Sequence, residues 1–227
     1  MIENLDLSKI FFIDIETVPQ YSEFEEMPEN FQKHWDKKSS HFRELTQNAA
    51  DVYHRAGIYS EFGKIVCISL GFIHNNNFRS KSFAGVDEKE ILINFAELLN
   101  DPKHKDKFFC GHNIKEFDIP YICRRMLING IKLPFQISIF GKKPWEISNL
   151  DTMDLWKFGD YKNFTSLALL ADIFDIPTSK DDIDGSQVAE VFYKEKNIER
   201  IAIYCEKDVL CTANLLLRFL GKPILTT

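Results

Sequence analysis

Two acidic side chains, Asp14 and Glu16, stand two residues apart at the end of an apolar run that begins at Phe11. A β-strand alternates its faces with a period of two, so both carboxylates are expected on one face, while Ile13 and Ile15 point into the core. Two carboxylates held so close repel each other, and one tends to take up a proton unless a cation neutralises the pair. The arrangement therefore suits a divalent metal ion, which binds carboxylate oxygens.

A plain structural interpretation of this pair stays open at this point. Other acids also stand two residues apart, as Glu23 does from Glu25, but they lie in polar sequence typical of helices and loops. An acid at the end of a buried strand costs several kcal/mol unless it has a partner. By itself, the pair favours a metal site and an exposed strand end equally.

Asp118 opens an expected helix that runs to about Leu127. Pro120 falls in the first turn of this helix, where proline is tolerated. An acid at that position complements the helix dipole, so Asp118 taken alone is explained as an N-cap.

Tyr204 and Asp208 are four residues apart in the last expected helix, which runs from about Ile198 to Leu220 and ends at Gly221. This spacing places both side chains on one face, one turn apart, so a phenol hydroxyl and a carboxylate can share a site. Taken singly, the tyrosine is explained by core packing and the acid by exposure on a helix.

The elements that position these residues are apolar strands and amphipathic helices, which together fit an open mixed sheet of the α/β class. Strands are expected over about 9–15, 65–72, 78–83 and 108–110, with a further strand edge at 149–152. Helices are expected after Asp87 to about Leu99, from Asp118 to about Leu127, from Thr165 or Ser166 through Phe174, in a short stretch after Gly185, and over about 198–220.

Residues 20–62 form a long polar segment dotted with aromatic side chains. We interpret it as a helical insertion, in which an amphipathic pair of helices covering one sheet edge is favoured over a dedicated binding arm. The residues at helical spacing are Phe31, Trp35, Phe42, Leu45 and Ala49.

Length and composition predict one globular domain over residues 1–227. Hydrophobic residues make up 44% of the chain and charged residues 27%, which shows no sign of disorder. The net charge of −6 argues against a protein that grips long duplex nucleic acid through a broad basic surface. It leaves open an enzyme for a short single-stranded end, because metal ions supply local positive charge.

Five cysteines, an odd number, form no Cys-x-x-Cys pair and lie mostly in apolar stretches. With the lack of a secretory signal they predict reduced core thiols and a cytoplasmic location. No apolar run approaches the roughly 20 residues that a membrane span requires, so no membrane partner is expected.

Three motifs in this order resemble the DEDDy family of 3′-to-5′ exonucleases. They are the strand Asp-x-Glu, the Asn-x-x-x-Phe-Asp that ends at Asp118, and the helical Tyr-x-x-x-Asp that ends at Asp208. The run from Asn113 to Arg125 is most similar to the proofreading exonuclease domain of family B DNA polymerases and to stand-alone bacterial proteins of that type. The resemblance is weakest over 20–60 and 131–148.

The resemblance implies a ribonuclease H-like fold, with a central mixed five-stranded sheet flanked by helices, and phosphodiester hydrolysis with two Mg²⁺ or Mn²⁺ ions. It implies that Asp14, Glu16 and Asp208 hold one metal ion, that Asp14 also contacts the second, and that Asp118 acts there directly or through water. Tyr204 would orient the attacking water, because a tyrosine with a pKa of about 10 is a poor base at neutral pH.

The same resemblance suggests three substrate-binding residues. Asn113 is expected at the terminal nucleotide, although an asparagine there also shapes a turn. Phe117 either stacks on a base or packs beneath the helix, with packing favoured, and Thr17 is expected near the 3′ end. His112 is rejected as a ligand.

Charged residues elsewhere are weaker candidates. Asp151 and Asp154 also lie near a predicted strand edge. They are not needed as metal ligands, since the family's four acids are already present. Arg124-Arg125 and Lys142-Lys143 are candidate phosphate contacts, although such pairs are usually solvated surface.

The expected activity is the stepwise release of nucleoside monophosphates from the 3′ end of single-stranded DNA. An RNA 3′ end is the alternative substrate, because no motif reports on the 2′-hydroxyl. A non-catalytic scaffold would be signalled by a missing acid, and none is missing. The chain has no room for a polymerase domain, so a DNA polymerase or repair partner would act in trans.

Overall fold

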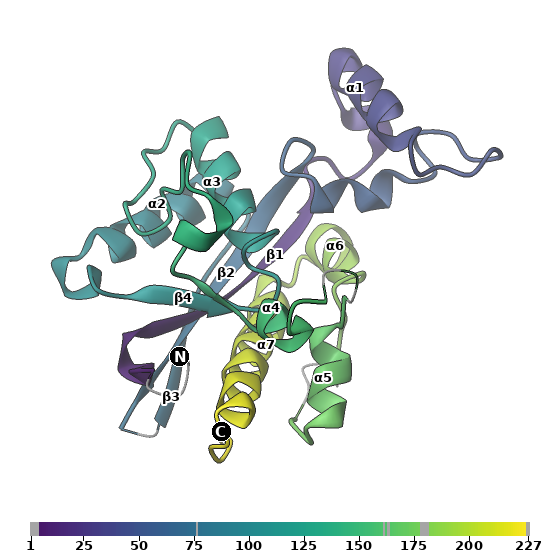
Figure 1. The fold of residues 1–227 in the computed structure, drawn as a ribbon. Coiled ribbons are helices and arrows are strands. Elements are labelled where there is room, and N and C mark those ends of the chain that lie inside the picture. The colour runs from purple at the N-terminus through teal and green to yellow at the C-terminus, as the bar shows by residue number, and fades with distance from the viewer. Residues whose placement is uncertain (1–4, 76, 161, 163, 178–181, 226–227) are drawn as a thin grey trace.

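The computed structural model describes residues 5–75, 77–160, 162, 164–177 and 182–225 (Figure 1). Its strands are β1 (Ile10–Pro19), β2 (Gly63–His74), β3 (Asn77–Ala84), β4 (Phe108–Gly111) and β5 (Leu150–Asp151). They form one sheet in the order β3-β2-β1-β4-β5. The β1–β2 and β2–β3 pairs are antiparallel, whereas β1–β4 and β4–β5 are parallel. The predicted α/β class and mixed five-stranded sheet are therefore confirmed.

The helices expected after residue 85 occur in the expected order, and one further helix, Thr152–Lys157, follows the predicted strand edge at 149–152. Short 3₁₀ turns lie between the elements. Asp87 and Ser166 cap their helices through side-chain hydrogen bonds, as expected. A π-helical stretch, Val191–Glu195, follows the short helix Val188–Glu190. The α-helices are α1 (Glu29–Ser39), α2 (Glu88–Asn100), α3 (Asp118–Ile128), α4 (Thr152–Lys157), α5 (Leu167–Ile173), α6 (Val188–Glu190) and α7 (Ile198–Phe219). The 3₁₀ turns are Leu7–Lys9, Phe24–Glu26, Tyr53–Ile58, Pro102–His104 and Pro144–Glu146.

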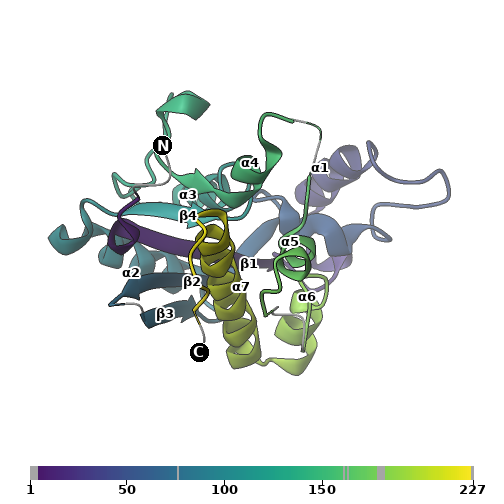
Figure 2. The same cartoon turned by 60° about the horizontal axis from the view of Figure 1, so that its bottom comes forward.

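Both faces of the sheet are covered by helices (Figure 2). On β1, Ile13 and Ile15 pack in a cluster with residues of α2 and α3, whereas Ile10 and Phe12 pack against α7. Because side chains alternate, the acid pair of β1 shares the face that α7 covers. Glu16 is only 7% exposed, so the interpretation as an exposed strand end is wrong.

β1 is longer than the expected 9–15 and continues to Pro19, which pairs with Gly63 of β2. The pairing register shifts between Glu16 and Thr17, where Val66 is the extra residue on β2. A bulge of this kind bends the ladder and re-aims nearby side chains. The irregularity therefore lies directly at the acid pair.

Residues 20–62 form a lobe beyond the ends of β1 and β2 (Figure 1). The predicted pair of helices is wrong, because α1 ends at Ser39, the following residues form turns, and Leu45 is fully exposed. The lobe is organised instead around Trp35, which is fully buried and donates its indole N–H to the carbonyl of Ala49 at 2.9 Å. Rings that surround this tryptophan belong to Phe42, Tyr53, Tyr59 and Phe62. That the lobe is an insertion within a single domain stays a prediction.

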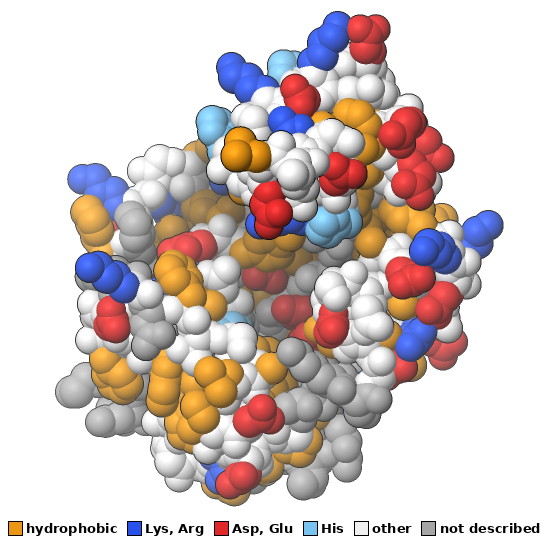
Figure 3. Space-filling view, turned by 90° about the vertical axis from the view of Figure 1, so that its right-hand side faces the viewer, with side chains coloured by type: hydrophobic (Ala, Val, Ile, Leu, Met, Phe, Trp, Pro, Cys, Tyr) orange, Lys and Arg blue, Asp and Glu red, His pale blue; other side chains and the backbone are white. Residues whose placement is uncertain are grey.

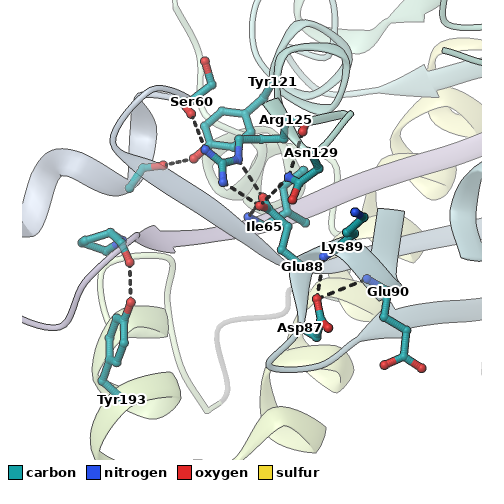
Figure 4. A network of polar contacts seen from close by, with 12 residues as sticks. Ser60, Ile65, Asp87, Glu88, Lys89, Glu90, Tyr121, Arg125, Asn129 and Tyr193 are labelled. Carbon is teal, nitrogen blue, oxygen red and sulfur yellow. Dashed lines mark hydrogen bonds and ion pairs between the residues drawn. The ribbon is translucent and has the colours of Figure 1, made fainter. Parts of the chain in front are cut away.

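A buried ion pair joins α2, α3 and the lobe (Figure 4). Glu88 accepts hydrogen bonds from Nε and Nη2 of Arg125 at 2.8 and 2.6 Å, and from the Ile65 N–H at 2.7 Å. Arg125 also donates through Nη1 to the carbonyl of Ser60 at 2.9 Å. Arg125 was a candidate phosphate contact, but it is 3% exposed and fully engaged, so that interpretation is wrong.

The five cysteines are buried and form no disulfide, which confirms them as core thiols. In the part of the chain that the structure describes, no helix has the length and apolar character needed to cross a membrane.

Candidate active site

The structure brings the four predicted acids together beside the central strand β1. Asp14 and Glu16 lie on β1, Asp118 is the first residue of α3, and Asp208 lies within α7. Burial raises the pKa of Asp14, and the negative charges of Asp118 and Asp208 raise it further. Burial likewise raises the pKa of Glu16, with further contributions from Asp14, Asp208 and Asp118. Asp118 and Asp208 therefore both lie within electrostatic reach of Asp14 and Glu16.

Asp118, taken alone, was expected to be the N-cap of α3, and this expectation is wrong. Phe117 occupies the cap position, and Asp118 is the first helical residue. The carboxyl group of Asp118 lies next to β1, because the backbone of Ile15 lowers its pKa. Asp118 is 3% exposed, and burial raises its pKa to about 7, with the charge of Asp151 adding to the rise.

Tyr204 and Asp208 share one face of α7, as their spacing predicted. The Tyr204 side chain is 8% exposed and forms a hydrogen bond with Asp208. Burial raises the pKa of the Tyr204 phenol, and the negative charges of Asp208, Glu16 and Asp14 raise it further. The phenol therefore stays protonated at neutral pH, which suits a hydrogen-bonding role and excludes a role as a base.

Cys205 is a site residue that the sequence analysis treated only as a core thiol. Its Sγ lies 3.4 Å from Oδ2 of Asp14 and 3.4 Å from the Asp14 carbonyl oxygen. Burial raises the pKa of Cys205, so the neutral thiol donates to the carboxylate. The signal was its position three residues before Asp208, since residues three apart lie on the same helix face.

The carboxylates of Asp14 and Glu16 fit a hard divalent cation, which prefers oxygen ligands. Their oxygens and the sulfur of Cys205 all lie within 4.8 Å of one another, and the protonated thiol of Cys205 supports Asp14 rather than serving as a ligand. Among the described residues, no lysine or arginine forms an ion pair with Asp14, Glu16 or Asp118. A bound cation would relieve the repulsion and burial that raise the pKa values of these acids.

The three candidate substrate-binding residues lie around this cluster. Asn113 adopts a left-handed backbone conformation, with φ of 67°, that asparagine tolerates better than most residues. Its N–H donates to Oδ1 of Asp151 at 2.9 Å, so turn formation accounts for its backbone. Phe117 and Thr17 are both half-buried and line a common cavity, and the Phe117 ring centroid lies 5.4 Å from that of Tyr121. Contacts of the three with a substrate stay predictions.

His112 and Asp151 have structural partners. The two ring nitrogens of His112 lie 2.9 Å from Oγ1 of Thr152 and 2.9 Å from the carbonyl oxygen of Thr165, and burial lowers its pKa. Asp151 accepts hydrogen bonds from backbone N–H groups after β4 and at the start of α4. Both residues therefore shape the loop that precedes Asp118.

A cavity of about 430 Å³ opens beside the acid cluster. Glu16, Thr17 and Phe117 line it from the sheet side, and His54 and Arg55 line it from the lobe. Figure 3 shows the corresponding hollow beneath the lobe, with acidic side chains at its base. The lobe residues could not be predicted from the sequence, because nothing in that polar segment distinguishes them from solvated surface.

The mixed five-stranded sheet, with Asp14 and Glu16 on its central strand, has the ribonuclease H-like class of fold that the resemblance implies. Residues 58–222 match the model of a family described as predicted 3′-5′ exonucleases related to the exonuclease domain of PolB. This match covers most of the chain and includes Asp118, Tyr204 and Asp208. The chain belongs to this family.

Among solved structures, the fold is similar to that of the family B DNA polymerase from the hyperthermophilic archaeon Pyrobaculum calidifontis, with a TM-score of 0.57 and 16% identity. The likeness covers 93% of this chain but only 24% of the polymerase. At this identity it shows the fold alone. No sequence among the curated proteins matches the chain.

Proposed function

We propose that this protein is a metal-dependent 3′-to-5′ exonuclease that removes nucleoside monophosphates from single-stranded DNA. The observation that carries the proposal is the convergence of Asp14, Glu16, Asp118 and Asp208, with the protonated hydroxyl of Tyr204, from three separate elements. Membership of a family of predicted 3′-5′ exonucleases supports the same chemistry. We infer a cytoplasmic location from the reduced thiols, and a polymerase or repair partner in trans stays a prediction.

Hydrolysis of a phosphodiester requires an activated water, in-line geometry and positive charge near the attacking and leaving oxygens. Divalent cations, when bound, supply that positive charge and lower the pKa of a bound water. Asp14, Glu16, Asp118 and Asp208 would hold them, because these carboxylates are gathered at one place beside β1. Tyr204 would orient the attacking water through its hydroxyl, which stays protonated next to Asp208.

Thr17 and Phe117 would contact the terminal nucleotide from the cavity wall next to Glu16. Asn113 would contact the same nucleotide from the loop that precedes α3. These contacts hold the 3′ end in place while the acids position the reacting phosphate.

The test is hydrolysis of 5′-labelled single-stranded DNA and RNA in Mg²⁺, Mn²⁺ or EDTA. The wild type should shorten the DNA stepwise from its 3′ end, in the presence of metal only, and faster than the RNA. Asp14→Ala and Asp208→Ala should leave the polymer intact. Failure to cleave either polymer would contradict the proposal, and faster cleavage of RNA would contradict its choice of substrate.

A further inference from the structure

The lobe forms one wall of the cavity beside the acid cluster. His54, Arg55 and Ile58 of the lobe line this cavity together with Glu16 and Phe117. Glu16 also belongs to the acid cluster, so the cavity and the cluster are continuous. A strand end that reaches the acids therefore passes next to the lobe.

Arg55 is a positively charged residue that is held in place without an acidic partner. Its guanidinium carbon lies 4.4 Å from the centroid of the Phe42 ring. In the described part of the chain no carboxylate forms an ion pair with Arg55, whereas Arg43 is paired with Asp36 at 2.8 Å. The Arg55 side chain is exposed, which leaves its N–H groups available to an anion.

The segment that carries Arg55 is fixed against the sheet. A Cβ atom on Gly57 would meet the Val18 carbonyl carbon at 3.0 Å, so the two backbones are in close contact. Tyr121 of α3 donates its hydroxyl hydrogen to the Gly57 carbonyl at 2.8 Å. Below this contact, the Tyr193 hydroxyl donates to the carbonyl of Pro19 at 2.5 Å (Figure 4). The position of Arg55 relative to β1 is therefore defined by packing and hydrogen bonds.

A positive charge at the position of Arg55 offsets the repulsion between the acidic site and an anionic strand. The protein carries a net charge of −6, and the acids at the base of the cavity repel a polyanion. An arginine matches a phosphate in charge and in its planar array of donors. Ile58, which is 50% exposed, and the half-buried Phe117 offer apolar surface to a nucleotide base.

We propose that Arg55 binds a backbone phosphate of the single strand, upstream of the bond that is cut, and so positions the 3′ end over the acids. The inference rests on the proposed exonuclease function. It goes beyond the family, because the matched family model begins at residue 58 and leaves Arg55 outside. The chemical class of ligand is a phosphodiester of a single-stranded nucleic acid.

The test compares two substrates that differ in upstream phosphates. One is a 5′-labelled single-stranded oligonucleotide, and the other is the p-nitrophenyl ester of thymidine 5′-monophosphate, which has no upstream phosphate. Arg55→Gln should lower kcat/KM on the oligonucleotide by about tenfold, mainly through KM, and leave ester hydrolysis unchanged. The slope of log affinity against log salt should fall in magnitude by about 0.7, as expected for one lost phosphate contact.

Two further variants separate charge from fold. Arg55→Lys keeps the charge and should recover part of the oligonucleotide activity. Lys33→Gln removes a charge from an exposed position of α1, where Lys33 pairs with Glu29 at 2.6 Å, and should behave as the wild type on both substrates.

The outcomes are distinguishable. A wild type that cleaves neither substrate would overturn the proposed function itself. Wild-type activity of Arg55→Gln on the oligonucleotide would overturn the assignment of Arg55 alone. An equal loss on both substrates would also overturn it, because the residue would then affect the reacting group or the fold rather than the upstream strand.

Discussion

The Sγ atom of Cys205 lies 3.4 Å from Oδ2 of Asp14 and thereby joins α7 to β1 at the acid cluster. This contact opposes the effect of burial, because the thiol donor lowers the pKa of the carboxylate that burial raises. It also fixes the orientation of Asp14, which the resemblance places at both metal ions. A buried cysteine is therefore part of the support of the site.

Replacing Cys205 tests this support. Cys205→Ala removes the donor to Asp14, so we expect the Mn²⁺ concentration for half-maximal activity to rise about tenfold, as for other residues that orient metal ligands. The control is Cys211→Ala, another buried cysteine of α7, which packs in a separate cluster with Leu170. An equal rise in both variants would show that the effect is loss of packing.

Asp118 should make the stability of the metal-free protein depend on pH. Its pKa rises to about 7 in the folded state, against about 3.9 in an unfolded chain. The folded state then binds more protons between these values, so this contribution to stability is present below about pH 4 and lost as the pH rises toward 7.

The measurement is Tm in EDTA at several pH values, for the wild type and Asp118→Asn. The asparagine side chain of the variant cannot ionise, so the variant lacks this loss of stability. The Tm of the variant minus the Tm of the wild type should therefore increase as the pH rises. A constant difference between the two proteins from pH 4 to 8 would contradict the account. Added Mn²⁺ should raise the Tm of the wild type more than that of the variant at pH 7.5.

Tyr204→Phe separates orientation of water from metal binding. The variant keeps the ring and loses the hydroxyl that hydrogen-bonds with Asp208. We expect kcat to fall on the order of 10²-fold, because the attacking water loses its alignment. The Kd for Mn²⁺, measured by calorimetry, should stay close to the wild-type value. A comparable loss in both quantities would mean that Tyr204 supports the metal site instead.

The buried pair of Glu88 and Arg125 should be essential to the fold. Arg125→Ala leaves the carboxylate of Glu88 buried without its counter-charge, so the free energy of unfolding should fall by about 3–5 kcal/mol. Arg124→Ala, at the adjacent exposed position, should change it by less than about 0.5 kcal/mol. Urea denaturation followed by circular dichroism measures both. Similar stability of the two variants would show that the pair contributes little.

Local periodicity was enough to predict the elements that carry the acids. The period of two put Asp14 and Glu16 on one strand face, and a spacing of four put Tyr204 and Asp208 on one helix face. Which side chains share a face depends only on the geometry of the strand or helix itself, so it does not depend on the tertiary structure around the element. The surroundings of Asp14 could not be predicted in this way, because Cys205 of α7, which contacts it, is nearly two hundred residues away along the chain.

The lobe and the ion pair escaped prediction for the same reason. Trp35 is buried by rings that follow it in turns rather than by a second helix, so helical spacing was misleading there. Arg125 looks like its exposed neighbour Arg124 in the sequence, and only the distant Glu88 distinguishes them. Arg55 meets the cavity through the fold of the lobe, for which the sequence contains no regular pattern.

The most direct test of the central claim is kcat/KM for a 5′-labelled single-stranded oligonucleotide in Mn²⁺. It should be measured for Asp14→Asn, Glu16→Gln, Asp118→Asn and Asp208→Asn, with Asp154→Asn as the control. Asp154 is an acid on the nearby α4 that pairs with Lys115 at 3.2 Å. If the four acids act as one catalytic cluster, each of their variants loses activity on the order of 10³-fold and Asp154→Asn keeps it. Retention of wild-type activity by any one of the four would contradict the cluster as described.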